Sequence, residues 1–463
     1  MVNKITTAYA SEIESISRLE PKYFLFQTIL NNTKKRFKFI KLGDISDNII
    51  RGQSPKPDTY RDKYEEGYVF IRTADVKKYQ INFQTTVYLN KETFESQKRN
   101  RIKGEDILIS VVGNYLGSTS IIPKNIYIGA FNDNSARIRI KDNLVSPYYV
   151  SFFLNSHFGQ ELINSVLTRT AQKILSAGNV KKLEIPIIED KTIEENAKKI
   201  YDKEIQSLNL LENAKKLLYQ KLGIDFSKVK KRNFFSVNLS DFSETDLWTP
   251  AYSYPFYINI LKIIQNKFPT IPIGEIAIVK KGDEVGSINY NKYLDKKNSD
   301  IPFIRTSDLV NYEVDQFPDY YIPDEIYQEL KQDIKAGDIL FTNDGKIGLA
   351  AMLTSQDKII LQSHVKRLRL KKEAIEKYNF TQEFLFLILT LKEIAIYQAE
   401  RYTVIQSTIP TISNYILDFE IPILDKDSIE EITKLVKQAF KLKEEKKILL
   451  NEVRELIDNY FEI

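Results

Sequence analysis

Side chains able to do acid–base or nucleophilic chemistry are sparse in this chain. It has two histidines, His157 and His364, and no cysteine, so thiolate nucleophiles, thiolate metal ligands and disulfides are excluded. His157 lies in an aromatic stretch, residues 152–158, which is typical of a partly buried structural histidine. His364 precedes a basic strand, where contact with solvent or with a nucleic acid is the simpler interpretation. The two positions are not equivalent in the internal repeat described below, so neither is favoured as a catalytic base.

One segment is similar to the carboxylate-and-lysine metal site of many endonucleases, since it contains Asp324, Glu329 and Lys331. The acids of such sites normally lie on successive strands, whereas this segment predicts a helix start capped by Asp324. The equivalent place in the other repeat holds Asn90 and Lys91, which excludes a duplicated active site. A metal-dependent nuclease is therefore a minor alternative, and it predicts that Asp324→Ala abolishes cleavage by the isolated chain.

Motifs that bind nucleotides or transfer methyl groups are missing from the sequence. There is no Gly-x-x-x-x-Gly-Lys-Ser/Thr phosphate loop and no Gly-x-Gly-x-x-Gly dinucleotide turn. The Asn/Asp-Pro-Pro-Tyr/Phe motif of amino-methyltransferases does not occur either. We therefore predict no catalytic residues, no metal ligands and no cofactor bound by this chain.

The elements that could position other functional residues occur twice. A strand at residues 68–75 and another at 301–308 share Phe-Ile-Arg-Thr-x-Asp at an offset of 233 residues. Turns at residues 103–110 and 336–342 also match when one residue is allowed as a gap, with Glu105 as the inserted residue. Because the period is far longer than that of a solenoid, it indicates a duplicated domain.

Further segments repeat in the same order. The alternating strands 136–140 and 366–370 have period two, which predicts half-exposed strands with basic residues on one face. A helix is expected after each, at 147–167 and 381–399. The aromatic cluster at residues 23–26, in a helical lead-in, is expected to have its counterpart at 246–252.

Two long helices follow the repeats, each introduced by Glu-Ile-Pro-Ile. Residues 184–223 contain a Thr192–Glu195 capping box and end at Gly223. The last helix has a heptad pattern with one interruption, Lys446. We expect the two helices to pair in antiparallel fashion rather than each to cap its own domain. The apolar positions of that pattern are Ile432, Leu435, Ala439, Leu442, Leu449, Val453, Leu456 and Tyr460.

Length and composition limit the architecture. At 463 residues, with 43% hydrophobic and 28% charged side chains, the chain is globular and too long for one core. The net charge of +5 permits a nucleic-acid partner without requiring one. No apolar run of about 18 residues and no signal peptide occur, so a cytoplasmic protein without membrane contact is expected.

The arrangement resembles the specificity subunit of type I restriction-modification systems. The similarity is carried by the Gly-Asp-Ile-Leu turns, the Phe-Ile-Arg-Thr strands, the Glu-Ile-Pro segments and the two long helices. It implies an α+β fold in which two internally repeated mixed α/β target recognition domains are separated by two long antiparallel coiled-coil-like helices. The expected boundaries are 1–190 and 224–426 for the domains, and 191–223 and 427–463 for the helices.

The resemblance also implies function and partners. Each domain would recognise one half of a bipartite sequence in double-stranded DNA, and the chain would be a non-catalytic scaffold for DNA adenine methyltransferase subunits, expected to number two. S-adenosylmethionine, ATP and Mg²⁺ would serve partner subunits. Whether a restriction subunit, the ATP-driven translocase and nuclease, takes part is left open. The alternative is a non-enzymatic two-domain scaffold that binds protein or RNA.

Base and phosphate contacts need Lys, Arg, Asn and Gln at exposed loop tips. The candidates in the first copy are Arg51, Gln53, Ser54, Lys56, Asn114 and Tyr115, and those in the second copy are Lys280, Lys281, Asn343, Asp344 and Lys346. The polar links before the long helices add Arg169, Gln172, Lys173, Arg401 and Gln406. For each of these residues, the competing interpretation is an ordinary solvated loop.

Overall fold

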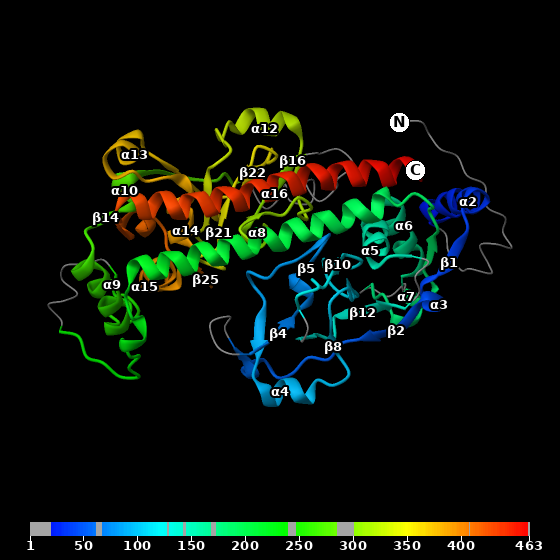
Figure 1. Cartoon of the computed structure of the whole chain (residues 1–463), viewed down its shortest axis with the longest axis horizontal. Helices are drawn as coiled ribbons and strands as arrows, with labels where there is room; N and C mark the ends of the chain where they lie inside the picture. Colours follow the sequence, from blue (N-terminus) through cyan, green and yellow to red (C-terminus); the bar gives the residue numbers. More distant parts are fainter. Residues whose placement is uncertain are drawn as a thin grey trace. The chain divides into compact units, whose positions relative to one another are not determined.

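Residues 20–61, 67–126, 129–141, 145–167, 173–238, 247–284, 301–406 and 408–461 are described by a computed structural model. The chain forms two compact units: unit 1 comprises Met1–Asp202 with Ile448–Ile463, and unit 2 comprises Lys203–Lys447. Portions of two long helices, α8 (Thr192–Leu222) and α16 (Lys426–Tyr460), belong to each unit (Figure 1). The predicted fold class, two mixed α/β repeats with two long helices, is confirmed.

Unit 1 is built on two sheets, an antiparallel sheet of four strands and a mixed sheet of five strands. The four-stranded sheet has the order β10 (Thr119–Ile121), β9 (Ile107–Ser110), β12 (Ser135–Ile140), β2 (Ser46–Arg51). The five-stranded sheet has the order β3 (Tyr60–Arg61), β7 (Val87–Leu89), β4 (Tyr68–Ile71), β11 (Gly129–Phe131), β8 (Arg101–Ile102). Two short ladders pair β1 (Phe39–Lys41) with β13 (Glu184–Pro186), and β5 (Val76–Lys77) with β6 (Gln80–Ile81). The helices are α2 (Pro21–Arg36), α3 (Leu42–Ile45), α4 (Lys91–Ser96), α5 (Pro147–Asn155), α6 (His157–Val166) and α7 (Ala177–Lys182).

Unit 2 repeats this plan. Its four-stranded sheet has the order β15 (Ala277–Lys281), β23 (Val365–Leu370), β20 (Ile339–Thr342), β21 (Ala350–Met352), and a second sheet has β19 (Tyr321–Ile322), β16 (Ile301–Ile304), β22 (Ile360–Leu361). Short ladders pair β14 (Thr270–Pro272) with β26 (Glu420–Pro422), β17 (Leu309–Val310) with β18 (Glu313–Val314), and β24 (Val404–Gln406) with β25 (Ile409–Thr411). The helices are α9 (Pro255–Lys267), α10 (Ile273–Ile276), α12 (Asp324–Leu330), α13 (Lys372–Tyr378), α14 (Gln382–Leu389) and α15 (Tyr397–Tyr402).

Three predicted helical segments differ from the structure. The helix expected over 147–167 is two helices, because the Ser156 side chain accepts a hydrogen bond from the Gly159 amide and starts a new helix. The one expected over 381–399 is interrupted by a π-turn at Lys392–Ile396. The counterpart of α2 is α9, not residues 246–252; of these, 247–252 precede that helix and residue 246 lies outside the described residues.

The repeated Phe-Ile-Arg-Thr-x-Asp motif has an architectural role in both units. In unit 1 the Asp75 carboxylate accepts hydrogen bonds from the Arg72 backbone amide at 3.0 Å and from its Nε at 3.1 Å. Asp308 and Arg305 make the same two contacts in unit 2, at 2.9 and 3.3 Å. Both aspartates are almost fully buried. The motif therefore closes a short helical turn after a core strand, which explains its repetition.

The Gly-Asp turns are a second repeated clamp. Asp106 accepts hydrogen bonds from the Arg139 guanidinium, with both N–O distances at 2.7 Å, and Asp338 accepts the equivalent bonds from Arg369 at 2.6 and 2.7 Å. These contacts raise the pKa of Arg139 and of Arg369. In each turn the aspartate also accepts from the backbone amide three residues earlier. A carboxylate thus fixes the turn to a neighbouring strand in both units.

The predicted one-residue gap between these turns is wrong. Lys103 donates its amide to Asp106 and Lys335 donates its amide to Asp338, so the four-residue turns align without an insertion. Glu105, with φ +68°, occupies the place of Gly337, with φ +85°. The first copy therefore has a glutamate in a left-handed conformation, where the second has the glycine that such a position favours.

The basic residues of the alternating strands are not on an exposed face, contrary to prediction. Arg137, Lys366 and Arg367 are all more than nine-tenths buried. Arg137 donates to the Arg101 carbonyl, and Arg367 donates to the Asp333 carbonyl at 2.5 Å. These side chains support neighbouring loops from inside the units.

The long helices begin close to the predicted positions, with different caps. The Asp190 carboxylate accepts a hydrogen bond from the Thr192 amide at 2.8 Å, so Asp190 caps α8 in place of the expected Thr192. The Asp425 carboxylate does the same for Ser428 in α16. As predicted, α8 ends at Leu222, and Gly223 adopts a left-handed conformation with φ +53°.

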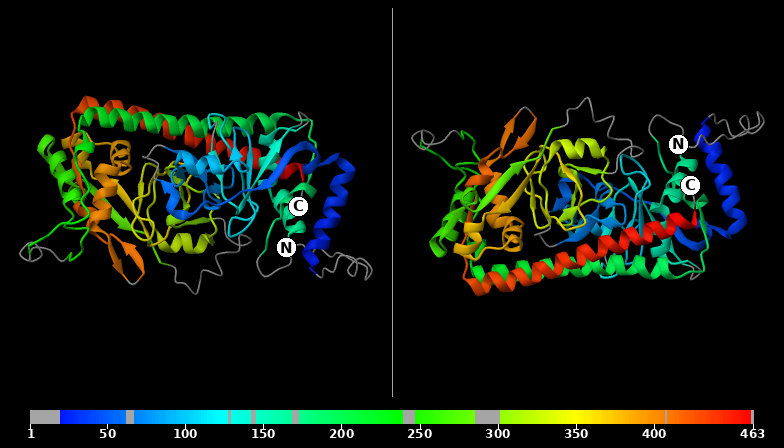
Figure 2. Two further views of the ribbon diagram at one scale, coloured as in Figure 1. Left: turned by 90° about the horizontal axis from the view of Figure 1, so that it is seen from below. Right: turned by 90° about the horizontal axis from the view of Figure 1, so that it is seen from above.

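The two helices pack together in antiparallel fashion, as predicted (Figure 2). In unit 2, Lys203 pairs with Glu445 at 2.6 Å and Lys221 pairs with Glu431 at 3.0 Å. In unit 1, the Tyr460 hydroxyl donates to Asp190 at 2.9 Å. The residue numbers rise from Asp190 to Lys221 while those of their partners fall from Tyr460 to Glu431, as in an antiparallel pair.

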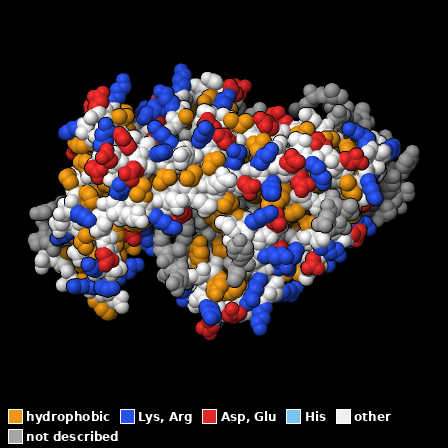
Figure 3. All heavy atoms as spheres, in the orientation of Figure 1, with side chains coloured by type: hydrophobic (Ala, Val, Ile, Leu, Met, Phe, Trp, Pro, Cys, Tyr) orange, Lys and Arg blue, Asp and Glu red, His pale blue; other side chains and the backbone are white. Residues whose placement is uncertain are grey.

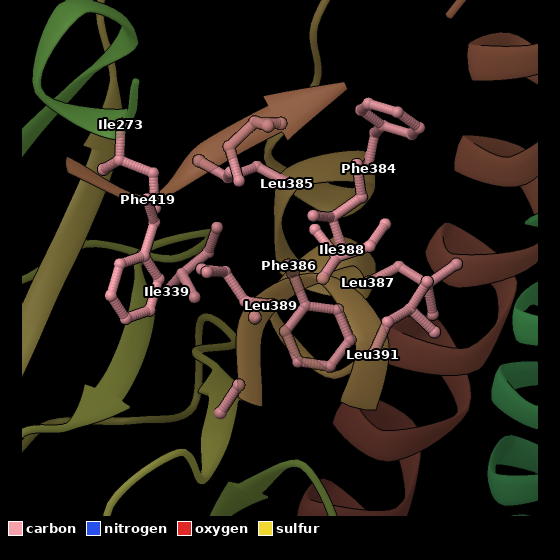
Figure 4. Close-up of a cluster of buried hydrophobic side chains, with 14 of the residues drawn as sticks. Ile273, Ile339, Phe384, Leu385, Phe386, Leu387, Ile388, Leu389, Leu391 and Phe419 are labelled. Carbon is pink, nitrogen blue, oxygen red and sulfur yellow. The ribbon is translucent and has the colours of Figure 1, made fainter. Parts of the chain in front are cut away.

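The predicted heptad stripe of α16 is confirmed in part. Ile432, Ala439 and Val453 are buried as predicted, whereas every second position of the pattern is only half-buried, namely Leu435, Leu442, Leu449 and Leu456. The buried positions include Val436, Phe440, Lys443, Lys447, Leu450 and Ile457. In unit 2, Phe440 packs edge-on against Phe386 of α14 with 5.1 Å between ring centroids. The helix therefore also packs against its domain, whose apolar core surrounds α14 (Figure 4).

Unit 2 also buries a balanced group of charges. Lys443, Lys446 and Lys447 of α16 face Glu204 of α8, Glu313 of β18 and Asp357, and all six side chains are at most 7% exposed. Lys446 contacts both Glu204 and Glu313, and Asn311 donates to Glu204 at 2.9 Å. Burial alone would raise the pKa of Glu313, but the three ammonium groups outweigh it and lower that pKa to about 2. The interruption of the heptad at Lys446 is therefore an ion-pair site.

Candidate nucleic-acid interface

Most of the predicted contact residues that the structure describes gather at one edge of the four-stranded sheet in each unit. In unit 1, β12 is antiparallel to both β2 and β9. The loops that follow β2 and β9 therefore lie beside the loop that precedes β12. In unit 2, β23 is antiparallel to both β15 and β20, with the same consequence. We call these the unit 1 edge (residues 51–56, 111–117 and 132–134) and the unit 2 edge (residues 280–284, 343–348 and 362–364).

The first loop of the unit 1 edge combines exposure with fixed geometry. Arg51, Gln53, Ser54 and Lys56 are exposed, as predicted, although Arg51 is the last residue of β2 and not part of the loop. The Arg51 guanidinium donates to the Asp133 backbone carbonyl, and the Ser54 hydroxyl donates to the Asp133 carboxylate at 2.6 Å. Its backbone is tied down as well, because the Gln53 amide donates to Phe131 at 3.3 Å. The loop therefore presents polar side chains from an anchored backbone.

The second loop of this edge contributes Asn114 and Tyr115. Asn114 is exposed, whereas Tyr115 is half-buried, and the Lys77 ammonium lies 3.8 Å from the centroid of its ring. The polar link reaches the same edge, since Leu175 donates its amide to Val111 at 3.0 Å. Lys173, two residues earlier, is exposed. Arg169 and Gln172 lie outside the described residues.

The unit 2 edge is built from the same elements, with different residues. Lys280 and Lys281 are exposed, but they are the last residues of β15 and not part of a loop as predicted. Lys346 is exposed on the second loop. Asn343 and Asp344 are only 3% and 8% exposed, so they are not the exposed tips that the sequence suggested. Their role at this edge is to support neighbouring groups.

Asp344 supports His364, which was not among the contact residues predicted from the sequence. The His364 Nδ1 and the Asp344 Oδ2 atoms are 2.6 Å apart, and the Asn343 amide donates to the other carboxylate oxygen at 2.6 Å. Both residues were visible in the sequence, but His364 precedes β23 and Asp344 follows β20. Their contact could have been predicted from the strand order alone, because the end of β20 lies beside the start of β23 in an antiparallel pair.

The second polar link forms a hairpin, β24–β25, at the unit 2 edge. Asp344 makes an isolated bridge with Thr411, and the Gly345 amide donates to Pro410 at 2.8 Å. Two apolar side chains of the hairpin, Ile405 and Ile409, are exposed. Gln406 belongs to β24, but its side chain is not described.

Arg401 is placed away from such a role. It is half-buried at the end of α15, its Nε donates to the Tyr252 carbonyl at 2.9 Å, and its guanidinium lies 4.3 Å from the centroid of the Tyr252 ring. These contacts give it a packing function within unit 2.

Catalytic alternatives find little support in the geometry. Asp324 is the first residue of α12 rather than its cap, and it pairs with Lys358 at 2.9 Å. Among the described residues, no group of three or more His, Asp or Glu side chains is placed to hold a metal ion.

Within the same residues, no helix is both long and apolar enough for a membrane span. Lys and Arg side chains are interspersed with acidic ones on the face shown in Figure 3.

Two repeated domains with like scaffolds and unlike sheet edges define a class of proteins built by internal duplication. The chain belongs to the type I restriction-modification specificity-subunit family. A family model described as "Type I restriction modification DNA specificity domain" matches residues 34–216 and again residues 266–453, which together exceed half of the chain. The resemblance read from the sequence is thereby confirmed.

Individual relatives are more distant. Over 149 residues the chain is 24% identical to the type I restriction enzyme EcoBI specificity subunit of Escherichia coli, a match that covers 31% of this chain and 30% of the relative. Among solved structures, the HsdS subunit from Thermoanaerobacter tengcongensis matches at 12% identity over 92% of this chain and 96% of that chain, with a TM-score of 0.30. The type I restriction-modification S subunit from M. genitalium matches at 12% identity over 92% and 95% of the two chains, also with a TM-score of 0.30.

Proposed function

We propose that this chain is the DNA-binding specificity subunit of a type I restriction-modification complex. Each unit reads one half of a bipartite DNA target through its sheet edge. The observation that carries this proposal is the pair of equivalent edges, which have the same strand and loop framework but different polar side chains. A protein that reads two unlike half-sites needs this combination of constant support and variable tips.

Each edge offers chemistry suited to DNA. Arg51 and Lys56 in unit 1, and Lys280, Lys281 and Lys346 in unit 2, provide cations for phosphate oxygens. Gln53 and Asn114 provide amides, which can pair with adenine in the major groove. Exposed isoleucines on the β24–β25 hairpin suit contact with a thymine methyl group.

Catalysis then belongs to partner subunits. The chain acts as a non-enzymatic scaffold for DNA adenine methyltransferase subunits, two in number, which use S-adenosylmethionine. A restriction subunit that uses ATP and Mg²⁺ is compatible with it. The imidazole of His364 at the unit 2 edge is paired with Asp344, and the proposal gives it no catalytic role.

The test is methylation mapping. The full chain is co-produced with its methyltransferase subunit, and modified adenines are located across a genome that otherwise lacks them. We expect one bipartite sequence with a fixed gap. Methylation without such a site, or binding to RNA in preference to duplex DNA in a gel shift, would instead support the two-domain protein- or RNA-binding scaffold.

The same proposal makes the long helices a spacer. A helix of about 31 residues is ~46 Å long, or about 13 base pairs of DNA. Because Lys203–Glu445 and Lys221–Glu431 pair in antiparallel register, an insertion must be made in both helices to keep them paired. Seven residues inserted between 203 and 221 and also between 431 and 445 should lengthen the gap and leave both half-sites unchanged. A change in the bases read would refute the spacer role.

A further inference from the structure

His364 is positioned at the unit 2 edge as a fixed ring, not as a mobile surface side chain. It immediately precedes β23, and 36% of its side-chain surface is exposed, whereas only 11% of its partner Asp344 is. Thus the hydrogen bond between Nδ1 and Oδ2 joins a largely buried carboxylate to a ring that reaches solvent.

Asp344 is itself held from two directions. The Asn343 side-chain amide donates to its free carboxylate oxygen, and its backbone is bridged to Thr411 of the β24–β25 hairpin. The Asn343 amide also lies 3.4 Å from the Thr411 hydroxyl. These contacts hold the carboxylate in place, so the direction of the imidazole is set by the loop that follows β20 and by Thr411 of β25.

This arrangement determines what the ring offers to a ligand. A carboxylate accepts hydrogen bonds, so we assign the Nδ1 atom of His364 as the donor in its contact with Asp344. In the neutral ring, Nε2 is then an acceptor. In the major groove, the groups that an acceptor can read are the exocyclic amines of adenine and cytosine.

The equivalent position of unit 1 can be identified by backbone hydrogen bonds. The Val111 amide donates to the Asn134 carbonyl at 3.0 Å, and the Asn343 amide donates to the His364 carbonyl at 2.9 Å. Asn134 therefore corresponds to His364, and Val112 takes the place of Asp344. Asn134 is exposed, and an asparagine amide can bond to adenine through both its oxygen and its nitrogen.

We propose that His364 and Asn134 are base-reading residues, each determining one position in the half-site of its own unit. Asp344 is a positioning residue that aims His364 and sets its tautomer. This inference rests on the proposed function, because it assumes that the two edges meet DNA. Beyond that function, the inference names the residues that select a base and the kind of base group that each selects.

The experiment compares His364→Ala and Asn134→Ala in the full chain, co-produced with the methyltransferase subunit. Methylated adenines are mapped, and binding is measured on duplexes that carry the wild-type site with each base substituted in turn. We expect His364→Ala to lower discrimination about 5- to 100-fold at one position of one half-site, and Asn134→Ala to do so at one position of the other half-site. Asp344→Asn should weaken discrimination at the same position as His364→Ala.

His157→Ala is the matched control. This histidine lies at the start of α6 and is exposed, contrary to the partly buried position that the sequence indicated. The control variant should leave both half-sites unchanged, and circular dichroism should show all variants folded. If the wild-type chain selects a bipartite site but neither edge variant relaxes it, or both relax the same half, the inference is wrong. If the wild-type chain selects no bipartite site, the proposed function itself fails.

Discussion

The sheet edges of the two units differ in their side chains while their backbones bond alike. In unit 1 the Ser54 hydroxyl donates to the Asp133 carboxylate, and in unit 2 the Ser363 hydroxyl donates to the Glu284 carboxylate at 2.9 Å. The serine and the acid have exchanged loops. Backbone bonds identify the equivalence, since the amides of Gln53 and Asp283 both donate to a carbonyl of the facing strand.

The repeated residues, by contrast, lie inside the units. The Arg72–Asp75 and Arg305–Asp308 pairs share one arginine–aspartate contact, and so do the Asp106 and Asp338 clamps. The repeated motifs thus belong to the supporting framework, whereas the side chains of the edges and of the buried charge group of unit 2 are among those that differ between the units. Each of these contrasts can be tested by exchanging residues between the units.

The largest effect is expected at the buried charge group. Glu313 in β18 corresponds to Gln80 in β6, a neutral residue in unit 1. Glu313→Gln removes one of three acids that balance three buried lysines, so it should lower the free energy of unfolding by about 3–5 kcal/mol at pH 7. Urea denaturation measures this. A loss below about 1 kcal/mol would mean that the charges are hydrated or rearrange.

The stability that Glu313 contributes should also depend on pH. The pKa of Glu313 is lowered on folding, so its contribution to stability is complete above the unfolded value of 4.5 and is lost as the pH falls towards about 2. The melting temperature of the wild-type chain should therefore fall more steeply below pH 4.5 than that of Glu313→Gln. Parallel curves would contradict the lowered pKa.

A smaller effect is expected at the Gly-Asp clamp of each unit. Asp106→Ala and Asp338→Ala each remove a buried carboxylate from an arginine that is 23% exposed and can be hydrated. We expect each to cost about 2–3 kcal/mol. Lys124→Ala, which removes an exposed partner of Glu105, is a control expected to cost less than about 1 kcal/mol. A cost below about 1 kcal/mol for either aspartate would show that its carboxylate does not hold the turn.

Sequence patterns predicted the parts of the fold that depend on local chemistry. The duplication, the two long helices and the left-handed end at Gly223 follow from spacing and composition, and the structure has them. The displaced part of the α16 stripe could not be predicted, because it depends on packing against Phe386, far away in the sequence. Likewise, exposed Arg51 and buried Asn343 are both polar residues near a strand end, and only the tertiary structure separates them.

The smallest effect is expected where the two turns differ in one residue. Glu105 and Gly337 share a left-handed backbone, and a Cβ added at Gly337 would meet no atom within 4 Å. Gly337→Ala should therefore cost about 1 kcal/mol through backbone strain alone, whereas Glu105→Gly should stabilise unit 1 or leave it unchanged, since a glycine relieves strain but loosens the unfolded chain. Gly178→Ala, inside α7 and free of close contacts, provides the opposite control and should stabilise by about 0.5–1 kcal/mol. If Glu105→Gly destabilised the chain by more than about 1 kcal/mol, the glutamate side chain itself, through its pairing with Lys124, would be holding the turn, and the two turns would differ in mechanism as well as in residue.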